Sequence, residues 1–307
     1  MKITVVIPLY NKKLSILSTI KTVLSQSMPA DEIIIINDGS TDGSDIIVDL
    51  LNHPQVTLIN QKNSGVSAAR NRGIALAKNE WIAFLDADDV WKPDYLKEII
   101  GLTELCPECS VLATAYELQD SSGNRTPILL NKIPFEGNSG RLSNYFEVAA
   151  SSHPPLWSSA IVVKKVALQA VGGFPVGIKS GEDLLTWARL AVRFQIAYSL
   201  NKLAVFILDK SHEISQKPKR LHDDNDIVGK ALINLYEESR TKSLKIYVSH
   251  WYKMRVSVCF RLNHKRGVFK YSMKALHYNI FNLKIYFFMV LVLLPNSIQT
   301  KIKQSHQ

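Results

Sequence analysis

The stretch Trp81-Ile-Ala-Phe-Leu-Asp-Ala-Asp-Asp89 places three carboxylates directly after a short, continuously apolar run. A run of this kind is typical of a strand that is covered on both faces. Earlier in the chain, three further runs share this character and are rich in Ile and Val: Ile3–Ile7, Glu32–Ile36 and Val56–Ile59. Together with Trp81–Leu85 they predict four short strands.

Helical patterns separate these four strands. The intervening segments are Lys12–Ser25, Gly43–Leu51 and Gly65–Ala77. Strands that alternate with helices predict βαβ units, a parallel sheet and right-handed crossovers. In such sheets ligands bind at the carboxyl ends of the strands. We therefore expect a crevice lined by residues 8–11, 37–40, 61–65 and 86–89.

The remaining patterns and the composition narrow the possible classes of protein. Ser159–Val163 predicts a strand and Glu182–Phe194 a helix, and apolar residues beyond 225 have helical spacing. The 307 residues are 46% hydrophobic and 21% charged, which excludes a disordered or collagen-like protein. Three cysteines exclude a disulfide scaffold. Because the pair Cys106 and Cys109 has no second pair to complete a zinc site, we interpret both as ordinary thiols.

The turn Asp86-Ala-Asp-Asp89 is the strongest chemical signal. Three adjacent carboxylates repel one another, and a hard divalent cation relieves that repulsion. Mg²⁺ typically takes one or two protein carboxylates and completes its shell with water and substrate phosphates. The structural alternative is a loop rich in helix-capping Asp.

Two further segments lie at predicted strand ends. Asp38, in Asn37-Asp-Gly-Ser-Thr-Asp-Gly-Ser44, can accept a hydrogen bond from a base N–H, or can cap a helix. The small residues of Asn63-Ser-Gly-Val-Ser-Ala-Ala-Arg-Asn-Arg-Gly73 let a helix begin close to an anionic ligand. Arg70 and Arg72 fall on different helix faces, so we expect one of them to point at the crevice; the alternative is a solvated pair.

These segments, in this order, resemble the family 2 glycosyltransferases with the GT-A fold. The match begins at Val5-Val-Ile-Pro-Leu-Tyr-Asn11 and includes the Asp38, Arg70 and Asp86 segments. Val171-Gly-Gly-Phe174 and Gly181-Glu-Asp-Leu-Leu-Thr-Trp187 resemble the family's Gly-Gly-Phe turn and its Glu-Asp motif on the acceptor side. The resemblance implies a GT-A catalytic domain over 1–215, with a nucleotide-binding half over 1–100 and an acceptor-binding half over 101–215. Residues 216–307 then form a helical, basic C-terminal extension.

The candidate site residues follow from these matches. We assign the nucleotide sugar to Pro8, Tyr10, Asn11, Asp38, Asn63, Arg70, Asp86 and Ala87. Asp183 matches the catalytic base, and Glu182 beside it orients the acceptor. Trp157 either lines the acceptor site or only begins a strand.

The metal contacts are assigned in the same way. Asp88 matches the direct metal ligand of the relatives. Many relatives also have a Tyr-Arg-x-His stretch followed by Ser, whose His reaches the metal or the diphosphate. Here only His212 and Ser215 match, because Asp209 and Lys210 stand where those relatives have Tyr and Arg.

The resemblance implies a metal-dependent, inverting enzyme that uses Mn²⁺ or Mg²⁺. Its donor is a nucleotide sugar, expected to be a UDP-sugar, and its acceptor is the hydroxyl of a saccharide, expected to be lipid-linked, in bacterial surface-polysaccharide biosynthesis. One alternative is a polyprenyl-phosphate sugar transferase, whose phosphate acceptor needs no strong base. Another is a non-catalytic sugar-nucleotide or membrane adaptor.

The charge of the chain is unevenly distributed. Residues 240–307 contain 13 Lys or Arg and no Asp or Glu, whereas the rest contains 24 basic and 27 acidic residues. A basic, aromatic segment that ends in the apolar run Ile285–Leu294 favours an interfacial helix on an anionic membrane surface. Ten helical residues span only about 15 Å, half of a bilayer core. The alternative is a helical cap on the catalytic domain.

These features also predict where the protein works. Met1–Tyr10 has the pattern of a first buried strand and not of a secretory signal. We therefore expect a cytoplasmic protein that is peripheral on the inner face of the cell membrane. Nucleic acid is not an expected partner, because residues 240–307 contain no recognisable nucleic-acid module.

Overall fold

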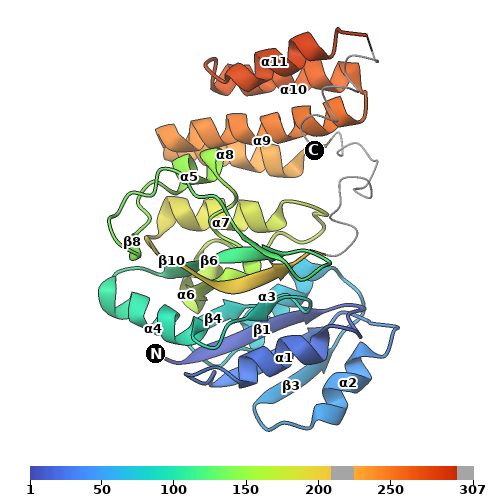
Figure 1. Ribbon diagram of the computed structural model, residues 1–307, viewed down its shortest axis with the longest axis vertical. Helices are drawn as coiled ribbons and strands as arrows, with labels where there is room; N and C mark the ends of the chain where they lie inside the picture. The colour runs from blue at the N-terminus through green and yellow to red at the C-terminus, as the bar shows by residue number, and fades with distance from the viewer. Residues whose placement is uncertain (209–224, 296–307) are drawn as a thin grey trace. The chain divides into compact units, whose positions relative to one another are not determined.

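The computed structural model describes residues 1–208 and 225–295, and the chain divides into two compact units, 1–215 and 216–307. The first unit is built on one sheet (Figure 1), with the strand order β3-β2-β1-β4-β9-β6-β10-β5. Four parallel strands form its first part: β1 (Ile3–Leu9), β2 (Glu32–Asn37), β3 (Val56–Asn60) and β4 (Trp81–Phe84). The predicted α/β fold with a parallel sheet is confirmed, and C-terminal helices follow it.

Helices cover both faces of these strands. The connections α1 (Ile16–Leu24) and α2 (Ser44–Leu51) both lead away from β1 in the order of the sheet, whereas α3 (Val66–Leu76) leads back across it to β4. Right-handed crossovers therefore place α1 and α2 on one face and α3 on the other. The three loops and the end of β4 meet at the carboxyl edge of the sheet.

The second part of the sheet mixes strand directions. β9 (Ile161–Lys164) is antiparallel to β4 and to β6 (Val111–Gln119), and β6 is parallel to β10 (Ile196–Ile207). Short strands complete it: β5 (Val90–Trp91), β7 (Arg125–Pro127) and β8 (Ser139–Arg141). The helices of this part are α4 (Tyr95–Leu105), α5 (Tyr145–Ser151), α6 (Lys165–Ala170) and α7 (Glu182–Arg193).

Two local predictions differ from the structure. The predicted strand at Ser159–Val163 begins as a 3-10 turn (η1, Ser158–Ala160), and β9 starts only at Ile161. The strand β3 is not covered on both faces, because it lies at the edge of the sheet and none of its residues is fully buried. Its apolar residues therefore resemble those of β1 and β2 in sequence but not in burial.

The second unit contains α8 (Ile227–Ser239), α9 (Lys242–Arg261), α10 (Lys265–Tyr278) and α11 (Leu283–Leu291). A buried carboxylate joins the first two helices. Asp226 accepts a hydrogen bond from the Gly229 amide at 3.0 Å and from Trp251 Nε1 at 3.2 Å, and it pairs with Arg255 at 2.6 Å. Over residues 1–208 and 225–295, no helix is long and apolar enough to cross a membrane.

Candidate active site

The turn after β4 presents the three adjacent carboxylates at the carboxyl edge of the sheet. Two other segments fix its backbone. The amide of Asp86 donates to Ser159 Oγ at 3.0 Å, and the Ala87 carbonyl accepts the hydroxyls of Ser15 at 2.9 Å and Thr19 at 3.1 Å. Ala87 is buried, and its backbone carbonyl makes these contacts. Asp86 and Asp88 keep about a quarter of their side chains exposed, at 26 and 29%.

Arg70, on α3, is the cation at the centre of the site. Its guanidinium pairs with Asp86 at 2.7 Å, lies 3.7 Å from a Glu182 carboxylate oxygen, and stacks 5.1 Å from the centre of the Phe174 ring. The side chain is only 4% exposed. Arg72 instead is exposed and donates to the Asn60 carbonyl at 3.1 Å. The two arginines thus face different ways, as their helical spacing predicts.

The Glu182–Asp183 pair begins α7, directly after Gly181, whose φ of 84° is in the left-handed region. This start places both acids in the first helical turn, where the helix dipole favours negative charge. Burial raises the pKa of Asp183, and Arg70 opposes that rise. Burial, with the neighbouring Asp183 charge, also raises the pKa of Glu182. An acid with a raised pKa is a better proton acceptor near neutral pH.

Asp89 connects the turn to Trp157 and to the end of β10. Its carboxylate accepts from Ser159 Oγ at 2.5 Å, Trp157 Nε1 at 3.2 Å and the Ile207 amide at 3.1 Å. Burial, followed by the charge of Asp86, raises the pKa of Asp89 to about 8. Asp89 therefore holds the Trp157 indole and the end of β10 against the turn.

The Trp157 indole packs against other aromatic rings. Its ring lies 5.6 Å from that of Tyr116 and 4.4 Å from that of Phe206. The predicted acceptor role of Trp157 is not tested by these contacts.

Asp38 is buried and its carboxylate is already engaged by its own chain. It accepts from Gln61 Nε2 at 2.7 Å and from the amides of Ser64 and Gly65, each at 2.8 Å. These bonds fix the loop between β3 and α3, and with it the start of the helix that carries Arg70. A carboxylate has about four lone-pair sites, so one acceptor position is left for a further donor.

The other residues assigned to the nucleotide sugar follow the strands β1 and β3. Tyr10 is 48% exposed, and Pro8 is partly buried beside it. Asn11 ties this end to the next loop, since its amide donates to Ser40 Oγ at 3.1 Å and its side chain accepts from the Thr41 amide at 2.8 Å. Asn63 is exposed at the end of β3. The four predicted strand ends therefore do meet at one edge, whereas the role of each residue stays a prediction.

The donor set of the site fits a hard divalent cation. Asp88, the predicted metal ligand, forms an ion pair with the ammonium of Lys12, so a cation already stands at that carboxylate. The carboxylate oxygens of Asp86 and Asp88 are the ligand type that Mg²⁺ and Mn²⁺ prefer. His212, the second predicted metal contact, lies outside the described residues.

Several site residues were not assigned a role from the sequence. Lys12 and Tyr116 give no signal in the sequence, because Lys and Tyr are common outside any motif, and Ser159 is predicted only at the start of a strand. Topology brings Lys12 to Asp88 from the loop after β1, and Ser159 to Asp86 and Asp89 from η1. Phe174 was recognised as part of the Gly-Gly-Phe turn, but its stacking on Arg70 needed the structure.

Cys106, Glu108 and Cys109 form the one group of three side chains, in the part of the chain that the structure describes, whose metal-ligand atoms all lie within 4.8 Å of one another. Burial raises the pKa of Cys106, and raises that of Cys109 to about 12. Protonated thiols are poor metal ligands. We therefore keep the interpretation of ordinary thiols.

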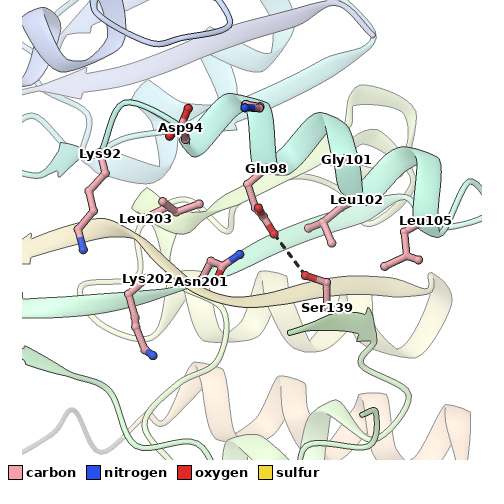
Figure 2. Close-up of a pocket in the computed structure, with 11 residues that line it drawn as sticks. Lys92, Asp94, Glu98, Gly101, Leu102, Leu105, Ser139, Asn201, Lys202 and Leu203 are labelled. Carbon is pink, nitrogen blue, oxygen red and sulfur yellow. Dashed lines mark hydrogen bonds between the residues drawn. The ribbon is translucent and has the colours of Figure 1, made fainter. Parts of the chain in front are cut away.

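A cavity of about 770 Å³ lies beside α4 (Figure 2). Several of its charged groups have partners in the same unit: Lys92 pairs with Glu117 at 2.9 Å, and Glu98 accepts from Ser139 at 3.3 Å. None of the candidate site residues lines it; the lining is Lys92, Asp94, Lys97, Glu98, Gly101, Leu102, Leu105, Ser139, Asn201, Lys202 and Leu203. The candidate chemistry therefore belongs to the sheet edge.

Comparison with known sequences agrees with this geometry. A family model described as glycosyl transferase family 2 matches residues 4–152. TuaG of Bacillus subtilis, a candidate teichuronic acid biosynthesis glycosyltransferase, is 35% identical over 205 residues, which cover 65% of this chain and 76% of TuaG. A glycosyltransferase of Rickettsia bellii is 33% identical over 196 residues, or 62% of this chain and 26% of that protein. The chain spans 26 to 38% of the length of that protein and of relatives from Nostoc, Escherichia coli and Rickettsia conorii.

Comparison with solved structures concerns the fold alone. Residues 1–349 of TarS from S. aureus, solved in complex with UDP-GlcNAc, match with a TM-score of 0.67 over 99% of this chain and 92% of that chain. The sequence identity is 15%. A second TarS structure, in complex with UDP, matches with a TM-score of 0.64 over 91% of this chain and 81% of that chain, at 17% identity.

Proposed function

Because the chain belongs to glycosyl transferase family 2, we propose that it moves a sugar from a UDP-sugar to a hydroxyl of a saccharide acceptor, with inversion at the anomeric carbon. One observation carries this proposal. Two pairs of carboxylates that are far apart in sequence, Asp86 with Asp88 and Glu182 with Asp183, gather around Arg70 and Lys12 at one edge of the sheet. Their negative charge exceeds that of the two cations.

The chemistry divides between the two sides of Arg70. On the donor side, Asp38 accepts a base N–H, and Asp86 and Asp88 would hold a divalent cation. The bound ion would stabilise the charge of the leaving diphosphate as a Lewis acid. On the acceptor side, Asp183 takes the proton of the attacking hydroxyl. Glu182 orients the acceptor. Asp89 holds the Trp157 indole beside the acceptor.

Burial supports Asp183 as this base, since it raises the pKa of its carboxyl toward the working pH. Arg70 limits that rise, because its positive charge favours the ionised carboxylate. Attack from the face opposite the leaving diphosphate then inverts the anomeric centre in a single displacement.

Two features support the finer role. The relative TuaG is named for teichuronic acid biosynthesis, which favours a bacterial surface polysaccharide as the product. The basic C-terminal unit favours a lipid-linked acceptor and a peripheral position on the inner face of the cell membrane. His212 belongs to the same proposal as a second contact to the ion or the diphosphate.

The test is the release of UDP from UDP-sugars by the full chain, with a bacterial lipid extract as acceptor, in Mn²⁺ and in EDTA. We expect release that requires the ion and falls at least tenfold in Asp88→Asn. The matched control is Asp120→Asn, whose carboxylate only orders an exposed turn with Asn124. Folded protein that releases no UDP from any donor contradicts the proposal, and release that is equal in EDTA contradicts its metal dependence.

A further inference from the structure

Helix α11 is apolar on both of its sides. On the inner side Ile285 is fully buried, and the Phe288 ring lies 5.4 Å from that of Phe260 on α9. On the outer side Leu283 is 77%, Phe287 50% and Val290 60% exposed. A soluble surface helix normally presents polar residues outward, and a helix that is hydrophobic all round is normally covered.

The exposed side chains form one continuous stripe. Their spacing of three or four residues puts them on one helix face, and the preceding turn adds Ile280 at 59% and Phe281 at 83% exposed. That turn is held against the helix by the Tyr286 hydroxyl, which donates to the Ile280 carbonyl at 3.0 Å. We call this stripe the α11 face; it comprises Ile280, Phe281, Leu283, Tyr286, Phe287, Val290 and Leu293.

The charge of the helices around the α11 face indicates what binds to it. Residues 242–291, which contain α9, α10 and α11, have ten Lys or Arg and no Asp or Glu; without Arg255, which pairs with the buried Asp226, nine remain. Two copies paired through this face would bring two basic units together, which like-charge repulsion opposes. An anionic lipid surface attracts the same charges, and each Lys or Arg close to it strengthens binding about fivefold.

The length of α11 decides how it meets lipid. Its nine residues extend about 14 Å, against a hydrocarbon core of about 30 Å. A short apolar helix with basic neighbours lies in the plane of the interface, with its apolar side chains reaching about 5–10 Å below the headgroups. Tyr286 suits that depth, because a phenol has an apolar ring and a polar tip.

We propose that the α11 face inserts into the surface of an anionic bilayer and holds the second unit there. This deepens the membrane contact of the proposed function, because it names the element that enters lipid. It does not depend on sugar transfer: the face would bind lipid whether or not the sheet edge binds a donor.

The experiment is flotation of the full chain with phosphatidylcholine vesicles that contain no or 30 mol% phosphatidylglycerol. We expect binding to the anionic vesicles to fall at least tenfold in Leu283→Ser/Phe287→Ser/Val290→Ser, with an unchanged Tm. The matched control is Ile46→Ser/Leu50→Ser, which removes two side chains of α2 that are 60 and 78% exposed. That control should bind as wild type does. Equal binding by the triple variant, or no binding by wild type, overturns the proposal.

A second readout does not depend on the triple variant. An environment-sensitive fluorophore on Val290→Cys should shift to the blue when anionic vesicles are added, since the native Cys106, Cys109 and Cys259 are buried and react slowly. No shift overturns insertion. A wild-type dimer that the triple substitution converts to a monomer, without vesicle binding, would show that the face pairs with a second copy. Nucleotide-sugar binding, measured in parallel, separates these outcomes from a failure of the proposed function.

Discussion

Two buried arginines, one in each unit, have different surroundings. Within residues 1–208 and 225–295, Arg255 pairs with one carboxylate, that of Asp226, at 2.6 Å. Arg70 pairs with Asp86 at 2.7 Å, lies 3.7 Å from Glu182, and also interacts with the acid that follows Glu182. The first pair is balanced. Around the second, carboxylates outnumber the arginine, so a proton or a bound cation must compensate the excess.

The comparison teaches how to separate a structural ion pair from a working site. Both guanidiniums stack on aromatic rings, at 5.1 Å from Phe174 for Arg70 and 5.1 Å from Trp251 for Arg255. Burial and stacking therefore do not distinguish them. The ratio of carboxylates to cations does, because excess negative charge adds to the effect of burial in raising carboxyl pKa values and also attracts a metal ion.

The largest expected effect is that of Asp183→Asn on turnover. Removing a general base typically lowers the rate about 10²–10⁴-fold, while the donor, bound on the other side of Arg70, should keep its dissociation constant. Initial rates of UDP release and donor titrations on the same protein measure both. Unchanged turnover would remove Asp183 from the base role and favour transfer to a polyprenyl phosphate, which needs no strong base.

Arg70→Met should weaken both stability and catalysis. Removing one partner of a buried ion pair costs about 3–5 kcal/mol. Because Asp86 and Glu182 are only partly buried, urea unfolding in EDTA should show a loss of unfolding free energy at the lower end of that range. UDP release should fall with it, because Asp86 and Glu182 lose their common anchor. A variant that is destabilised but fully active, once folded at low temperature, would make Arg70 a structural residue like Arg255.

Arg255→Met should affect stability alone. The Gly229 amide and Trp251 Nε1 still donate to the Asp226 carboxylate in this variant. We therefore expect the unfolding free energy to fall by about 3 kcal/mol, the lower end of the range for breaking a buried ion pair. Donor binding should be unchanged. The double variant Arg255→Met/Asp226→Asn should recover part of the loss, and a donor-binding defect in either would contradict the contrast between the two units.

The pH dependence of stability has a definite sign. The folded pKa of Asp89, about 8, is above the ordinary value of 3.8, so the folded state binds more protons between these values. The unfolding free energy should therefore fall as pH rises from 4 to 8, by at most about 1.4 kcal/mol per pH unit. Asp89→Asn should flatten that slope in EDTA. A slope that is identical in wild type and variant would show that Asp89 is ionised throughout.

The smallest effect is expected at Gly101, in the middle of α4, where it lines the cavity beside that helix. A Cβ added there meets no heavy atom within 4 Å. Gly101→Ala should therefore stabilise the protein by about 0.5–1 kcal/mol through helix propensity. UDP release should not change, and a change would show that the cavity beside α4 takes part in the reaction.

Much of this site could be predicted from the sequence because its parts are local. The apolar run before Asp86 and the turn residues after Asp38 are contiguous signals, and βαβ alternation brings strand ends to one edge. The same reasoning failed at β3, because burial on both faces depends on the sheet order, which periodicity does not encode. It also failed at Ser159, where a 3-10 turn replaces the expected strand start.

The pairings that give the site its charge balance could not be predicted. Arg70 meets Glu182 over more than a hundred residues, and Lys12 meets Asp88 from another loop. Neither pairing follows from any spacing in the chain. In the second unit, the exposed stripe on α11 became visible only once Ile285 was found on the opposite, buried side.

The most direct test of the central claim is the thermal unfolding of the full chain with UDP, GDP, CMP and dTDP sugars, in Mn²⁺ and in EDTA. A ligand that binds only the native state, at a hundredfold its dissociation constant, adds about 2.7 kcal/mol of stability. We expect a rise in Tm with UDP-sugars that requires Mn²⁺ and is lost in Asp88→Asn. Folded protein whose Tm is unchanged by every nucleotide sugar would contradict a donor site at the sheet edge.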